Sequence, residues 1–174
     1  MVAWAFGWVA CASVNGVSLD VGDEITGGSG AYAMTLMAPG WQRIPPAETG
    51  YPGADLVLRH DQAGAVAVIH VHEKAETLDW IVLQRWQLVT ATNEVVGFEE
   101  KRSFRPGPDY VAISIATYRL KTRRGWAPMR AAALRGDNAV IEVILLGGTA
   151  PLNESLFGDL VAGLVLPRAG GDAG

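Results

Sequence analysis

The chain has 174 residues, of which 49% are hydrophobic and 18% are charged, and its formal net charge is −4. This composition excludes an intrinsically disordered chain, and the length favours one compact domain. The acidic balance leaves no surplus of cations to neutralise phosphates, so we expect no nucleic-acid partner. A single cysteine excludes an internal disulfide and a zinc site built on paired cysteines.

The first segment, residues 1–11, resembles a signal peptide that ends in a lipobox. It has no charged residue, and the apolar run Val2–Ala10 stops directly before Cys11. In a lipoprotein, cleavage at this point makes the cysteine the new terminus, and its acyl chains anchor the protein in a membrane. Two features depart from the pattern: Trp8 stands where Leu is usual, and no Lys or Arg precedes the run. The alternative is that residues 2–12 form a buried first element with Cys11 as a core thiol.

Two further segments lack the pattern of a packed element. Residues 12–30 are rich in Gly, Ser, Asp and Thr without periodic apolar spacing, which predicts a flexible linker. Residues 167–174 combine Pro, Gly and Ala with few apolar anchors, which predicts a disordered tail. We therefore expect the folded domain at residues 31–166.

The domain is predicted to begin with strands. Tyr32–Met37 is a short strand candidate that Pro39 and Gly40 stop, and Trp41 begins a predicted loop. Asp55–His60 and Ala65–His72 are apolar runs joined by a short turn, which is typical of a β-hairpin. The second run is apolar on both faces, so we expect it in the middle of a covered sheet.

An amphipathic helix should follow the hairpin. Thr77 can cap its first turn, and Asp79 there favours the positive end of the helix dipole. The helix is expected to end near Thr92 and Asn93. Its apolar residues recur on one face: Leu78, Ile81, Val82, Trp86 and Val89.

The second half of the domain predicts an antiparallel meander and a closing helix. Short turns rich in Gly, Pro and Asn separate the predicted strands, which makes sequential strands neighbours. These strands are Val95–Phe104, Tyr110–Lys121, Ala127–Leu134 and Ala139–Leu146. The helix should start around Pro151–Asn153, with Leu156, Phe157, Leu160, Val161 and Leu164 as its buried stripe.

Together these elements predict an α+β fold, in which one helix covers each face of an antiparallel sheet as an α/β/α sandwich. The chain resembles the PsbP-like family, which includes a photosystem subunit, a Ran-binding Mog protein and bacterial lipoproteins. The resemblance covers residues 31–166 and rests on element order and a few motifs: Pro39-Gly40-Trp41, the hairpin, Thr77-Leu78, the meander, and Leu156-Phe157. It implies a binding or accessory role without a catalytic centre.

The most suggestive polar cluster is the pair His70 and His72, with Glu73 beside it. Residues two apart on a strand project from one face, so the two imidazoles could converge on one metal ion. A metal-dependent hydrolase is therefore one alternative function. Histidines at a strand end more often have structural hydrogen bonds, and the chain has no nucleophile elbow and no phosphate-binding loop. We therefore expect no catalytic residue, no metal site and no cofactor.

Trp41 and Trp126 are the candidate binding residues, because each lies in or beside a predicted loop, where a large aromatic side chain can anchor a partner. The alternative is that each tryptophan closes one end of the core. We expect a non-catalytic binding or accessory module of the bacterial cell envelope, tethered to a membrane through Cys11, with a protein or envelope component as its partner. A cytoplasmic adaptor or chaperone-like protein of the same fold is the other alternative.

Overall fold

The structure, a computed structural model, describes residues 16–51, 53–73, 76–103, 111–122 and 125–167. The elements in chain order are β1 (Val17–Ser18), β2 (Glu24–Thr26), β3 (Ala33–Thr35), β4 (Trp41–Ile44), the 3-10 helix η1 (Pro46–Glu48), β5 (Leu56–His60), β6 (Ala65–Glu73), α1 (Leu78–Thr92), β7 (Glu94–Ser103), β8 (Ala112–Thr122), β9 (Gly125–Arg135), β10 (Ala139–Gly147), α2 (Ala150–Ala162) and β11 (Leu164–Val165).

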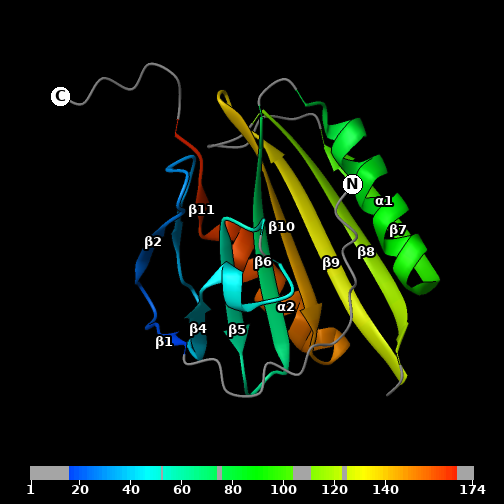
Figure 1. Ribbon diagram of the computed structural model, residues 1–174, viewed down its shortest axis with the longest axis horizontal. Helices are drawn as coiled ribbons and strands as arrows, with labels where there is room; N and C mark the ends of the chain where they lie inside the picture. Colours follow the sequence, from blue (N-terminus) through cyan, green and yellow to red (C-terminus); the bar gives the residue numbers. More distant parts are fainter. Residues whose placement is uncertain (1–15, 52, 74–75, 104–110, 123–124, 168–174) are drawn as a thin grey trace.

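Within the described residues, eight strands form one antiparallel sheet in the order β1-β4-β5-β6-β10-β9-β8-β7 (Figure 1). Three short strands form a second sheet in the order β11-β3-β2. No helix in this part of the chain is long and apolar enough to cross a membrane. The predicted α+β class and the hairpin-helix-meander-helix order are confirmed.

Alternate residues of the central strand β6 enter two different cores. Ala67 and Ile69 belong to the cluster that contains Phe157 of α2, whereas Val68 belongs to the cluster that contains Val89 of α1. Because successive side chains of a strand point to opposite faces, α1 and α2 cover opposite faces of the sheet. In Figure 1, α2 lies behind β6 and β10, and α1 lies over the other edge of the sheet. We call the two faces the α1 face and the α2 face.

The centre of the sheet joins segments that are distant in the sequence. All nine residues of β6 pair with β10, and its other edge pairs with β5, so β6 occupies the central position predicted for it. Gly147 ends β10 with a φ of 86°. A Cβ at Gly147 would collide with the carbonyl oxygen of Gly64 in the hairpin turn, so glycine lets the two chains approach closely.

Local signals set the ends of α1. The Thr77 side chain accepts a hydrogen bond from the backbone N–H of Trp80 at 3.2 Å, which satisfies one donor of the first turn. Asn93 ends the helix, and its backbone N–H donates to the carbonyl of Val89. The predicted cap and end of this helix are therefore confirmed.

The N-terminal part of the described chain corrects two predictions. Residues 16–30 are not a flexible linker, because β1 pairs with β4 and β2 pairs with β3, and Ile25 lies in the core of the α2 face. Trp41 does not begin a loop, because it is the first residue of β4. Strands of two to four residues are too short to show a hydrophobic period, so neighbouring backbone decides them. The predicted signal-peptide segment and residues 168–174 of the predicted tail lie outside the described residues.

Candidate functional site

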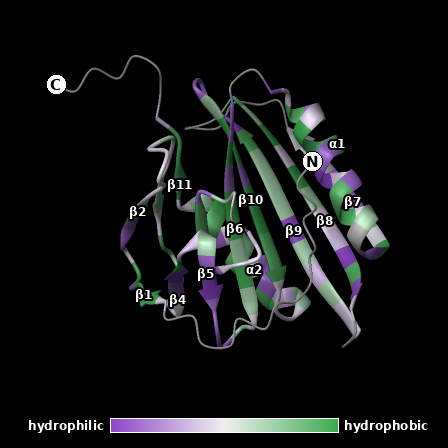
Figure 2. Cartoon of the chain, in the orientation of Figure 1, coloured by the Kyte–Doolittle hydropathy of each residue, from purple (hydrophilic) through white to green (hydrophobic). Residues whose placement is uncertain are grey.

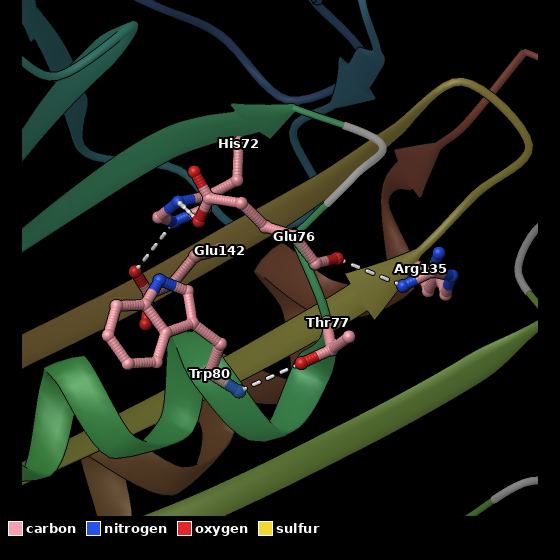
Figure 3. A network of polar contacts seen from close by, with 6 residues as sticks. All are labelled: His72, Glu76, Thr77, Trp80, Arg135 and Glu142. Atoms are coloured by element: carbon pink, nitrogen blue, oxygen red, sulfur yellow. Dashed lines mark hydrogen bonds and ion pairs between the residues drawn. The ribbon is translucent and has the colours of Figure 1, made fainter.

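The predicted histidine pair lies on β6, beside β10. Figure 3 shows His72 of this pair close to the start of α1. His72 bridges two carboxylates: its Nε2 is 3.1 Å from Glu142 Oε2, and its Nδ1 is 3.4 Å from Glu76 Oε2. On the other side of Glu142, Oε1 lies 3.5 Å from Nη1 of Arg85, which α1 contributes. We call Arg85, Glu142, His72 and Glu76 the ion network.

The centre of the ion network is buried. The side chains of Arg85 and Glu142 are 2% and 7% exposed, and that of His72 is 19% exposed. The guanidinium nitrogens of Arg85 make no hydrogen bond within the described part of the chain, so Glu142 is their ion-pair partner there. A buried charge is tolerated only when an opposite charge compensates its lost hydration. The two side chains therefore depend on each other.

The network shifts the pKa of its members in opposite directions. Burial alone would lower the pKa of His72, but the hydrogen bond with Glu142 and the charges of Glu142 and Glu76 outweigh it and raise the pKa above its usual value. Burial alone would raise the pKa of Glu142, but His72 and Arg85 lower it. Burial lowers the pKa of neighbouring His70. His72 therefore favours the protonated form, and Glu142 favours the ionised form.

This arrangement suits a structural role better than metal binding. A metal ligand must be a neutral imidazole, whereas the carboxylates beside His72 raise its pKa and so favour its protonated form. The His70 and His72 ring centroids are 6.4 Å apart, and Glu73 is exposed at the end of β6. Among the described residues, no group of three or more His, Cys, Asp or Glu side chains could hold a metal ion.

The ion network connects the beginning of α1 to the sheet. The Glu76 carbonyl accepts a hydrogen bond from Nη1 of Arg135 on β9 at 3.0 Å, and Thr77 next to it caps the helix (Figure 3). Arg85 then joins the third turn of α1 to β10 through Glu142. Arg85 and Glu142 were not predicted as site residues. In the sequence, Arg85 is a charged residue at the buried spacing between Ile81 and Val89 of the helix. Glu142 is a charged residue within an apolar strand.

The two candidate binding tryptophans have different surroundings. Trp41 is 1% exposed, and its ring packs edge-on against His60 at a centroid distance of 5.2 Å. Trp41 is therefore no candidate for binding a partner and matches the alternative in which the tryptophan closes the core, because β4 turns this residue into the core of the α2 face. Trp126 is 54% exposed, and the cations of Arg119 and Lys121 lie 5.8 and 5.9 Å from its ring centroid. Its role as a binding residue stays a prediction.

A larger apolar surface lies on α1, where the sequence analysis did not place one. Trp80 and Leu83 are 49% and 45% exposed on the outer side of the helix. Leu83 and Trp86 are neighbours one turn apart on the helix. The centroid of the Trp86 ring lies 4.7 Å from that of Phe98 on β7, and the Phe98 side chain is also exposed. We call Trp80, Leu83, Trp86 and Phe98 the α1 stripe. It could have been found in the sequence, because α1 has apolar residues around its whole circumference.

Cys11, the predicted lipidation site, lies outside the described residues. The first residue of a described strand is Val17, six positions after it.

The fold is shared with solved structures of low sequence identity. The chain matches cyanobacterial PsbP (CyanoP) from Synechocystis sp. PCC 6803 with a TM-score of 0.61 at 16% identity, over 90% of this chain and 98% of that one. It matches the Ran-binding protein Mog1p from Saccharomyces cerevisiae with a TM-score of 0.52 at 11% identity, over 90% and 97% of the two chains. No protein-family model and no curated protein sequence matches. The predicted PsbP-like fold is confirmed.

Proposed function

We propose that this chain is a non-catalytic binding or accessory module of the bacterial cell envelope, held at a membrane by acyl chains on Cys11. The α1 stripe carries the proposal of a binding role: Trp80, Leu83 and Phe98 are exposed, and the half-buried Trp86 lies against Phe98. Contiguous apolar surface on a soluble domain, with large aromatic residues in it, is typical of a protein interface. The outer side of α1 supports this, because its exposed residues are uncharged apart from Asp79.

The fold and the polar chemistry support an accessory role over catalysis. CyanoP and Mog1p share the fold, and the latter is a Ran-binding protein, which makes a protein the best-supported class of partner. The most deeply buried charges, those of Arg85 and Glu142, face each other. A catalytic acid or base needs to reach a substrate, and these side chains are shielded from one. The cytoplasmic adaptor differs from this proposal in its location and shares its binding surface.

The binding role is tested by placing a photo-crosslinking amino acid at Leu83 in the full chain in its native host. The matched control places the same amino acid at Ser155, an exposed position on α2. We expect one defined adduct from Leu83, which Trp80→Ala removes without loss of the folded protein, and no adduct from Ser155. Equal adducts from both positions, or an adduct that Trp80→Ala leaves unchanged, would contradict a specific site on α1.

The anchor is tested by growing the host with a labelled fatty acid. We expect the label on the native chain and its loss in Cys11→Ser, because the thiol is the only one in the sequence. If Cys11→Ser is labelled as strongly as the native chain, the anchor assignment is wrong. The cytoplasmic adaptor would then be the better description.

A further inference from the structure

We infer that the N-terminal edge of the domain rests against the bilayer, with Val17, Val21 and Met37 in contact with lipid headgroups. We call these three residues the N-terminal rim. The inference rests on the proposed anchor at Cys11 and adds to it an orientation of the domain. The α1 stripe, at the other edge of the sheet, is then directed toward soluble partners.

The chain between Cys11 and the folded domain is short. Because β1 begins at Val17, the residues from 11 to 17 can span at most about 20 Å when fully extended. A linker that continued to residue 30 would span about three times as much and would leave the domain free to turn. The pairing of β1 with β4 removes that freedom, since Val17 lies opposite Arg43 in the main sheet. An anchor at Cys11 therefore keeps this edge of the sheet close to the membrane.

The rim residues are the most exposed large apolar side chains among those the structure describes. Val17 is 67% exposed, Val21 57% and Met37 55%. Backbone hydrogen bonds from Gly22 to Leu36 and from Leu36 to Asp23 bring the Val21 turn beside the segment that contains Met37. Figure 2 shows β1 in the hydrophobic colour at the edge of the molecule. Such side chains gain free energy when they leave water at a membrane interface.

The charges around the rim select the kind of lipid. Asp20, Asp23 and Glu24 are exposed in and beside the same turn, and the Asp23 carboxylate accepts a hydrogen bond from the backbone N–H of Asp20. Three carboxylates are repelled by the negative surface potential of anionic lipids. We therefore expect the rim to contact a zwitterionic phosphatidylcholine surface more closely than one rich in phosphatidylglycerol.

The α1 stripe is far from this contact. The main sheet places β1 at one edge and β7 at the other, and seven strand spacings of about 4.8 Å separate them by roughly 34 Å. Figure 1 shows β1 and α1 at opposite sides of the molecule. When the β1 edge touches the bilayer, Trp80 and Leu83 stay in water.

The test uses the only cysteine of the chain, Cys11, which is coupled to a maleimide lipid in phosphatidylcholine vesicles. Hydroxyl-radical footprinting with mass spectrometry then reports the exposure of each side chain in free and coupled protein. We expect the labelling of Val21 and Met37 to fall by about half or more, as for side chains that enter a membrane interface, while that of Trp80 and Leu83 is unchanged. Unchanged labelling of Val21 and Met37, or protection of Trp80 and Leu83 instead, would overturn the inference.

Variants sharpen the result. The double variant Val17→Thr, Val21→Thr keeps the side-chain size and should restore the labelling of Met37 to the free value, whereas the control Leu83→Gln should leave the protection of Met37 intact. Phosphatidylglycerol vesicles should reduce the protection in the native chain. Because the lipid is coupled chemically, the footprinting result does not depend on acylation in cells. If the native chain takes up no labelled fatty acid in the host but Met37 is protected on vesicles, only the anchor is rejected. If the native chain takes up the label but Met37 is not protected, only the rim is rejected.

Discussion

The two faces of the main sheet bury different chemistry. On the α2 face the neutral Asn153 is fully buried and bonded: its amide donates to the Gly147 carbonyl at 2.8 Å and accepts from Arg130 at 2.8 Å. On the α1 face Arg85 and Glu142 are buried as charges, at a separation of 3.5 Å. α2 is held by apolar area, by the Asn153 hydrogen bonds and by an ion pair whose Glu154 side chain is exposed, whereas α1 depends in part on buried charges that must stay paired.

This difference agrees with the outer surfaces of the helices. α1 exposes Trp80 and Leu83, whereas the apolar residues Leu156, Phe157 and Leu160 of α2 are buried. A helix that is held partly by a titratable network and presents an apolar surface is suited to respond to a partner. A helix that buries most of its large apolar side chains is suited to fix the core. The comparison predicts different responses to mutation on the two faces.

The largest effect is expected in the core of the α2 face. Phe157→Ala removes a side chain that is 5% exposed from the main cluster, so we expect a loss of about 3 to 5 kcal/mol in the free energy of unfolding. Chemical denaturation measures it. Leu152→Ala, at an exposed position of the same helix, is the control and should cost less than about 1 kcal/mol. Similar losses for the two variants would show that the α2 face is not packed as described.

On the α1 face, Arg85→Met should cost about 3 kcal/mol, because it leaves Glu142 buried without the cation of α1. The double variant Arg85→Met, Glu142→Gln removes both charges and should recover part of the loss. A double-mutant cycle measured by chemical denaturation would then give a coupling energy of about 1 to 3 kcal/mol. Strictly additive losses would mean that the two charges do not stabilise each other.

A smaller effect depends on pH. The pKa of His72 is raised in the folded protein, so its contribution to stability is fully present below its unfolded value of about 6.5 and is lost as the pH rises through the folded value. His72→Gln should therefore cost more at about pH 6 than at about pH 9. The lowered pKa of His70 acts in the opposite direction, but it is present in both proteins. Chemical denaturation of both proteins at the two pH values measures this cost. An equal cost at both would show that Glu142 and Glu76 do not favour the protonated form of His72.

The smallest effect is expected at Trp126, which is exposed on the α2 face. Trp126→Ala removes two contacts with the cations of Arg119 and Lys121, and exposed contacts of this kind contribute about 0.5 to 1 kcal/mol. We expect a loss of no more than about 1 kcal/mol in chemical denaturation. A loss as large as that of Phe157→Ala would show that Trp126 is part of the core instead of a free surface residue.

The candidate site could be predicted only in part. The spacing of His70 and His72 placed both on one face of β6, which the structure confirms. The partners of His72 could not be inferred, because Glu142 comes from a strand 70 residues later and pairs with β6 only in the folded sheet. Trp41 and Trp126 had similar local sequence, yet one is buried and the other exposed, since the neighbouring strands decide how much of each side chain is covered.

The sequence by itself determined the elements whose signals are local: the β5–β6 hairpin, the capped helix α1, the antiparallel meander and the closing helix α2. Turn residues, a cap and apolar periodicity act over a few neighbouring positions, so they can be read along the chain. Only the tertiary structure decided the pairing of β6 with β10, the ordering of β1 and β2 as strands, and the burial of Arg85 against Glu142. Each of these depends on backbone or charge supplied by a distant segment, and that proximity exists only once the sheet has formed.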